Sequence, residues 1–247
     1  MSTALANKLS RMALLGFAAA LLAASMVGAA GPAYRLRLVD LDVAFSLLRW
    51  GAWLGLVAVL VALAAAWVTR PGTRNRGFML ALAGVVCGGI AFGAPFAMLQ
   101  NAKKAPPIHD ITTDTGNPPR FVAIVPLRSS APNSVEYEGE AIAKQQHAAY
   151  PDIQPALLAI PRDAAFEQAL NGARDLGWEI VAAVPNEGRL EATDTTSWFG
   201  FKDDIVVRVT PTASGSRIDV RSLSRLGKGD LGKNAARVRA YLQRIRQ

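Results

Sequence analysis

Residues 203–225 read DDIVVRVTPTASGSRIDVRSLSR, and this stretch decides the fold of the C-terminal part of the chain. Every second residue is Ile or Val in residues 205–210 and again in residues 217–221, which is the period of a strand with one buried face. A turn that contains Gly215 separates the two runs. The stretch therefore predicts two consecutive strands that pair antiparallel.

Two more strands precede this pair. Trp178–Val184 and Leu190–Thr195 read as strands, and the four residues Pro185-Asn186-Glu187-Gly188 between them are typical of a turn. Four short strands in a row, with tight connections, favour an antiparallel meander.

Helices are predicted on both sides of the four strands. Apolar residues recur at helical spacing in residues 166–176, and Gly177 ends that helix. From Leu231 to Ile245 they step by four and three, and Asp230 is the expected N-cap. The order helix, four strands, helix over residues 162–247 predicts an α+β fold, with an antiparallel sheet and two helices in two layers.

Proline dominates the segment before this core. Residues 103–161 contain nine prolines, which fix φ and remove backbone donors, so long helices are excluded there. We expect an extended segment that wraps the domain, with one edge strand at Phe121–Val125.

The first part of the chain has a different composition. Hydrophobic residues make up 51% of the whole chain, yet residues 1–101 carry only 8 Lys/Arg and 2 Asp/Glu, against 19 and 17 in residues 102–247. This split excludes a disordered chain and a wholly cytosolic enzyme. It predicts a membrane region over residues 1–102 and a water-soluble domain after it.

Three uncharged runs in the membrane region are long enough to span a bilayer, which takes about 20 helical residues. They predict transmembrane helices at about residues 12–31, 50–69 and 77–100. Ionisable residues are absent from the predicted spans, which argues against a proton pump or an ion pathway.

The first run also resembles a secretory signal. Lys8 and Arg11 precede an apolar centre, and small residues follow at Val27-Gly28-Ala29. The chain has three spans if this segment is retained and two if it is cleaved. In either case, the part after residue 102 is expected outside the cytoplasm. The Lys/Arg count is five on each side of the membrane, so the charge bias does not decide the orientation.

Small residues lie one helical turn apart in the spans and let helices approach closely in lipid. This pattern predicts a tight bundle or a homo-oligomer, and the alternative is ordinary Ala/Gly-rich composition. The residues are Gly16, Ala20, Ala24 and Gly28 in the first span, Gly51 and Gly55 in the second, and the pairs Gly84/Gly88 and Gly89/Gly93 in the third.

The first candidate site is the cluster of His109, Asp110 and Asp114, which Asp203 or Asp204 could complete. Carboxylates and an imidazole can hold a divalent cation or act as acid and base. The alternative is that these Asp side chains bond nearby backbone groups. The only cysteine, Cys87, lies in a span, so the soluble domain has no thiol chemistry. No H-E-x-x-H, G-x-S-x-G or P-loop motif occurs.

The second candidate is aromatic. Trp198, Phe199 and Phe201 lie within four residues, between two predicted strands. If exposed, they could enter a membrane interface or hold an apolar ligand, and if buried they form a corner of the core.

The third candidate is basic, because residues 217–247 carry nine Lys/Arg and two Asp. Arg221, Arg225, Lys228 and the amides at the start of the last helix could hold a phosphate or a lipid headgroup. Arg208 and Asn234 complete the set of ligand-binding candidates.

Internal pairing is the alternative for these arginines, with Asp110, Asp114, Asp203 and Asp204 as partners. Cross-strand alternation of charges favours this alternative. Nucleic-acid binding is improbable, because the net charge of the soluble part is only +2.

Three spaced blocks of sequence occur in residues 106–237. They are Pro106-Pro107-Ile108-His109-Asp110-Ile111-Thr112-Thr113-Asp114, the run from Glu191-Ala192-Thr193 through Trp198-Phe199-Gly200-Phe201 to Asp203-Asp204-Ile205-Val206-Val207-Arg208, and Ser216–Ser222 followed by Ser224-Arg225, Gly227, Asp230-Leu231-Gly232 and Asn234-Ala235-Ala236-Arg237. Together these blocks resemble domain-of-unknown-function family 1499, a bacterial and plastid family. The likeness covers about residues 106–245, and a member with spans ahead of the domain has a similar layout. The family has no agreed activity, cofactor or catalytic residue.

These observations lead to a functional expectation. We expect a membrane-anchored envelope protein in the bacterial inner membrane with a periplasmic C-terminal domain. Its expected role is a non-enzymatic binding or assembly module for a lipid, a glycan or a protein partner. The alternative is a metal-dependent or acid/base hydrolase at the membrane surface. No cofactor, metal site or catalytic residue is assigned.

Overall fold

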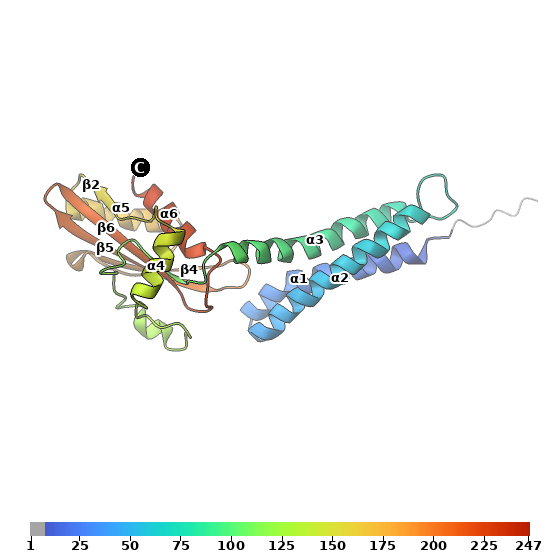
Figure 1. Cartoon of the computed structure of the whole chain (residues 1–247), viewed down its shortest axis with the longest axis horizontal. Coiled ribbons are helices and arrows are strands. Elements are labelled where there is room, and N and C mark those ends of the chain that lie inside the picture. Colours follow the sequence, from blue (N-terminus) through green and yellow to red (C-terminus); the bar gives the residue numbers. More distant parts are fainter. Residues whose placement is uncertain (1–7) are drawn as a thin grey trace, which may run out of the picture. The chain divides into compact units, whose positions relative to one another are not determined.

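The computed structural model describes residues 8–247, and the chain divides after residue 101 into two compact units (Figure 1). The first unit is made of long helices, and the second contains a β-sheet with helices. The predicted α+β fold behind apolar N-terminal helices is confirmed.

Three helices form the N-terminal unit: α1 (Arg11–Arg35), α2 (Leu41–Val68) and α3 (Phe78–Lys104). Each is long and apolar enough to cross a membrane. The Ser10 hydroxyl accepts a hydrogen bond from the Ala13 amide and caps α1. The three predicted spans are therefore helices, and each extends beyond its uncharged run into polar residues.

Small residues mediate the contacts between these helices. A Cβ atom added to Gly88 would lie 2.8 Å from the Gly55 carbonyl oxygen, so the α2 and α3 backbones touch there. The buried residues recur at steps of three and four, the spacing of left-handed packing. They include Ala13, Gly16, Ala20, Ala23, Val27 and Ala30 in α1, Gly51, Gly55, Ala58, Ala62 and Ala65 in α2, and Ala81, Gly84, Gly88 and Ala91 in α3.

This stripe differs from the predicted faces, which step by four throughout. Ala24 is half-buried and Gly28 is exposed, because a strict step of four drifts around the helix while steps of three and four stay on one side. Gly89 and Gly93 also have open space where a side chain would project. The remaining predicted glycines pack within the chain, and self-association stays a prediction.

The sheet of the second unit is built on the predicted meander. Its strands β3 (Glu179–Val184), β4 (Arg189–Thr195), β5 (Lys202–Thr212) and β6 (Gly215–Ser224) pair antiparallel in sequence order. Two three-residue strands that the sequence did not predict pair with the free edge of β6. They are β1 (Asp110–Thr112) and β2 (Ala156–Leu158).

The β5–β6 turn has a strict requirement for glycine. Gly215 has φ 147°, and a Cβ atom there would lie 2.1 Å from the Leu158 carbonyl oxygen. The close approach of β2 therefore depends on the absence of a side chain at this position.

Two helices cover one face of the sheet, as predicted: α5 (Arg162–Asp175) and α6 (Lys233–Arg244). Trp178 stacks on Tyr241 in the core beneath them. Gly177, with φ 75°, follows the end of α5 as expected. The main core also contains Phe166, Leu190, Ile205, Val207, Val209, Ile218, Val220 and Val238.

The expectation for Asp230 needs a correction. The N-cap position of α6 is Gly232, which adopts a left-handed conformation. The Asp230 carboxylate still caps the helix, because it accepts hydrogen bonds from the Gly232 and Asn234 amides. A residue two positions before the N-cap thus supplies the capping oxygens.

The proline-rich segment covers the other face of the sheet. We call residues 117–137 the strap. Phe121 and Ile124 from the strap pack on Val206 and Leu223 of the sheet, forming a second small core. A 3-10 helix, η1 (Val125–Arg128), lies within the strap, and α4 (Glu140–Ala149) follows it.

One prediction for this segment is wrong, and one helix in it was not predicted. Phe121–Val125 is not an edge strand, because three of its amides donate to a side chain and not to a neighbouring strand. The helix α4 was not expected. It forms in the proline-free interval between Pro132 and Pro151.

Candidate functional site

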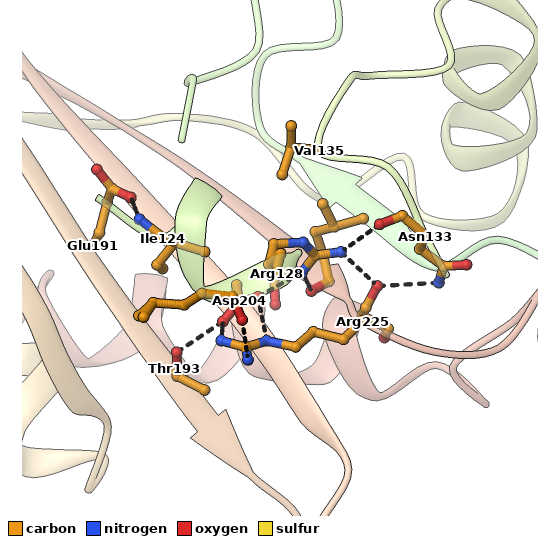
Figure 2. Close-up of polar contacts among 12 residues, drawn as sticks. Ile124, Arg128, Asn133, Val135, Glu191, Thr193, Asp204 and Arg225 are labelled. Carbon is orange, nitrogen blue, oxygen red and sulfur yellow. Dashed lines mark hydrogen bonds and ion pairs between the residues drawn. The ribbon is translucent and has the colours of Figure 1, made fainter. Parts of the chain in front are cut away.

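The strap is joined to the sheet through a buried aspartate on β5. The Asp204 carboxylate is fully buried and accepts hydrogen bonds from Arg128 of η1, from Thr193 of β4 and from Arg225 (Figure 2). The Arg225 contact is bidentate, with both N···O distances at 2.8 Å. Burial alone would raise the pKa of Asp204, but these donors outweigh it and hold the pKa below the ordinary value.

A second anchor fixes the strap backbone. The buried Glu191 carboxylate accepts hydrogen bonds from the Val122, Ala123 and Ile124 amides at 2.9 to 3.1 Å, and Figure 2 shows the last of these. Arg189 on the same strand pairs with Glu191. Glu191 thus takes the place of a neighbouring strand for these amides.

Asp110 from the first candidate cluster pairs with Arg221 of β6. The Arg221 guanidinium donates to both Asp110 oxygens and also to the Pro119 and Val135 carbonyls of the strap. Its charge lies over the rings of Phe121 and Tyr137. Burial raises the pKa of Asp110, and the pairing with Arg221 opposes that rise.

Asp114 belongs to a network at the adjacent part of the sheet. Its carboxylate accepts from Arg208 and Arg217, and the same two arginines also pair with Asp219. Asp219 is almost completely buried and also accepts from the Thr113 hydroxyl. Both ends of the segment 110–114 are therefore held by arginines of β5 and β6.

His109 and Asp203 do not join these networks. His109 lies 3.5 Å from the Glu138 carboxylate and 3.4 Å from the Lys228 carbonyl oxygen. Asp203 faces the helices and pairs with Arg237 of α6 at 2.7 Å. The expected joining of His109 with Asp203 or Asp204 is not observed. Within residues 8–247, no three His, Cys, Asp or Glu side chains are arranged to hold a metal ion.

The aromatic candidates lie together at the β4–β5 connection. Phe199 is buried and stacks on Phe201, and Trp198 meets Phe199 edge-on. Trp198 and Phe201 are half-buried. The cluster thus combines a core role with partial exposure.

The predicted phosphate cradle at the start of α6 is not available. The capping carboxylate of Asp230 occupies the helix amides, and Arg225 is paired with Asp204. Asn234 uses its whole amide, accepting from Ser222 and Arg237 and donating to Ser224 and the His109 carbonyl. Lys228 is exposed. The expected internal pairing is present for Asp110, Asp114 and Asp204.

Two cavities border the strap and share Asn117, Pro118 and Arg120. The smaller has a volume of about 280 Å³ and lies between the strap and β4 and β5. The larger, of about 550 Å³, lies between the strap and α4. Tyr137 and Arg221 line the larger one, and burial raises the pKa of Tyr137 to about 12.

Sequence reasoning missed several residues of these networks. Arg128 and Arg237 gave no local signal, because their carboxylate partners lie 34 to 76 residues away. The pairing of Arg189 with Glu191 was not predicted, although the two residues lie only two positions apart. Glu191 gave a usable signal, since a single charge within the run Leu190-Glu191-Ala192 marks a buried counter-ion or a buried acceptor.

Comparison with known proteins gives one match. The model of a family described as proteins of unknown function, DUF1499, matches residues 110–245. No curated protein and no solved structure matches the chain. The matched region contains the strap, the sheet and all the paired acids described above.

Proposed function

The chain belongs to the DUF1499 family, whose function is unknown, and we propose from its own geometry that it is a membrane-anchored, non-enzymatic binding module. Its three apolar helices anchor it, and the domain formed by residues 102–247 presents the binding surface. The ligand classes that fit an envelope protein are a lipid, a glycan and a protein partner.

One observation carries this proposal: the candidate acids already serve as counter-ions. Asp110, Asp114 and Asp204 each accept from arginine side chains, and Asp203 pairs with Arg237. A general base or metal ligand needs a carboxylate whose lone pairs can reach the substrate or ion. Here the lone pairs point into the fold, which favours a structural role for the acids.

The strap gives the module its surface. Glu191 fixes its backbone, Asp204 holds its Arg128 side chain, and it borders two cavities. Because a rigid surface loses little conformational entropy on binding, a braced strap suits recognition.

Thermal unfolding of the full chain in an uncharged detergent tests the proposal. We expect the unfolding midpoint to rise with one class of compound among anionic lipids, glycans and soluble phosphates, with no compound converted to product. Release of a product that is lost in His109→Ala would overturn the proposal in favour of a hydrolase. A midpoint that no class raises would also contradict it.

We further propose that residues 102–247 lie outside the cytoplasm of a bacterial cell, at its inner membrane. A single cysteine at the exposed position Gln243, in a chain carrying Cys87→Ala, tests this orientation. A membrane-impermeant maleimide should label Gln243→Cys in intact cells. Labelling only after lysis would place the domain inside.

A further inference from the structure

We propose that the smaller cavity, between the strap and strands β4 and β5, binds a phosphate group. This inference rests on the proposed binding function and assigns it a site and a ligand class. Arg120, Arg189 and Arg208 line the cavity together with apolar side chains. The phosphate can come from a lipid headgroup or from a soluble ester, since both present the same oxygens.

Two of the three arginines retain unused donors, whereas each guanidinium nitrogen of Arg189 contacts Glu187 or Glu191. Arg208 uses only Nη2, for Asp114 and Asp219, so within residues 8–247 its Nε and Nη1 groups donate to no atom. Arg120 is exposed and has no hydrogen-bond or ion-pair partner in the same range. Guanidinium groups bind phosphate oxygens through paired N–H donors, and several such groups match the three or four oxygens of a phosphate.

Buried acids hold two of these cations in place. Arg189 pairs with Glu191, and Arg208 pairs with Asp219, and both carboxylates are almost completely buried. The side chains of the two arginines remain 15% and 24% exposed. The negative charges of Glu191 and Asp219 thus lie on the protein side, while the two arginines border the cavity, so little ordering is required when a ligand binds.

The remaining walls are apolar. Val122, Val206, Pro118 and Pro119 line the cavity, and Val206 is buried. Apolar walls lower the local dielectric constant, which strengthens a charge-assisted hydrogen bond. A volume of about 280 Å³ suits a headgroup-sized fragment and not a whole lipid.

Glu187 is the one acid that lines this cavity among the described residues. It is exposed and pairs with Arg189. Its charge opposes an incoming anion, so Glu187→Gln should tighten phosphate binding. An increase in affinity is informative because a misfolded variant cannot produce it.

The test uses the full chain in an uncharged detergent, with 31P NMR line broadening of inorganic phosphate and of glycerol 3-phosphate as the readout. We expect broadening with the wild type, and binding about tenfold weaker or more in Arg120→Gln. Arg120→Lys should bind phosphate with intermediate affinity, because lysine keeps the positive charge but lacks the planar, paired N–H donors of a guanidinium group. Arg246→Gln removes another exposed arginine, whose side chain has no hydrogen-bond or ion-pair partner among residues 8–247, and should leave binding unchanged.

A second arm identifies the source of the phosphate. The full chain is placed in nanodiscs of phosphatidylcholine, with or without phosphatidylglycerol, and its unfolding midpoint is measured. A rise with phosphatidylglycerol that Arg120→Gln abolishes, without broadening of the soluble phosphates, supports a lipid headgroup. Broadening of the soluble phosphates without that rise supports a soluble ester.

Two results would overturn the inference. If phosphate binding is the same in Arg120→Gln and in Glu187→Gln as in the wild type, the phosphate binds at another site. The proposed binding module is not contradicted by that result. If phosphate binds in neither arm and a glycan raises the unfolding midpoint, phosphate is excluded as the ligand class. The proposed binding function then stands. Only the failure of every compound class contradicts both proposals.

Discussion

The two units of this chain bury their interiors by opposite means. The helices α1–α3 meet through alanine and glycine, with the Gly55 and Gly88 backbones in contact. The domain formed by residues 102–247 buries charged pairs, among them Arg128 with Asp204 and Arg221 with Asp110. In lipid no hydrophobic force drives helices together, so close packing must do so. In the domain formed by residues 102–247, arginines join a proline-rich segment to a sheet because a buried carboxylate balances the charge of each of these arginines.

The largest effect is expected from removing a buried charge. Asp204→Asn leaves Arg128 and Arg225 without their common counter-ion, so the free energy of unfolding of the unit formed by residues 102–247 should fall by about 3–5 kcal/mol. Urea unfolding of the full chain, followed by pulse proteolysis, measures this change. Asp163→Asn, at a side chain 92% exposed, is the control and should change it by less than about 0.5 kcal/mol. Equal effects of the two variants would mean that the buried network does not stabilise the domain.

A smaller effect is expected in the membrane unit. The Cβ of Gly88→Val would meet the Gly55 carbonyl at 2.8 Å and Val59 at 3.0 Å, so overpacking should destabilise the bundle by about 1–3 kcal/mol. Unfolding in mixed micelles with increasing SDS measures it. Gly89→Val introduces the same side chain where no atom of residues 8–247 lies within 4 Å of the added Cβ, and it serves as the matched control. If both variants unfold at the same SDS fraction, the close glycine contact is unimportant.

The response to acid should separate the two units further. The pKa of Asp204 lies below its ordinary value in the folded chain, so the unfolded chain binds more protons in acid. The stability that Asp204 contributes is therefore complete above about pH 4 and is lost as the pH falls through the folded pKa. We expect a smaller change than in Asp204→Asn, because a protonated carboxyl keeps two oxygens that can accept hydrogen bonds, whereas asparagine replaces one of them with an NH2 donor. The difference in stability between the wild type and Asp204→Asn should narrow in acid. A constant difference at all pH values would contradict this assignment.

The smallest effect is expected at an exposed pair. Arg244 and Asp175 connect α6 to α5, and each side chain is 46% exposed. Arg244→Gln should lower the stability by no more than about 1 kcal/mol, since solvent screens the pair. Repeating the urea unfolding at high salt should reduce the effect further. A loss as large as that of Asp204→Asn would show that exposure does not distinguish these ion pairs.

Much of the fold could be predicted because it has a local period. The alternation in residues 205–210 and 217–221 identified β5 and β6, and Gly177 marked the end of α5. The strands β1 and β2 could not be found in this way. Three residues carry no period, and these strands exist only because β6 offers them an edge.

The candidate site was predictable in its charges and not in its geometry. The alternation of Arg208, Asp219 and Arg221 indicated internal pairing, which the structure contains. The role of Glu191 depends on amides 67 to 69 residues earlier in the chain, which no local pattern encodes. The prediction of a strand at Phe121–Val125 was wrong because its apolar composition suits either a strand or the strap. The contact that decides between them is distant in the sequence.

The anchoring of the strap at Glu191 has a consequence for biosynthesis. A growing chain exposes the strap amides before the ribosome has made Glu191, and β1 before it has made β6. At ordinary translation rates of about 5–20 residues per second, the strap amides wait roughly 3 to 14 seconds for Glu191, which lies 67 to 69 residues later. The prolines of the strap suit that interval, because they discourage mistaken strand pairing until the last strand arrives.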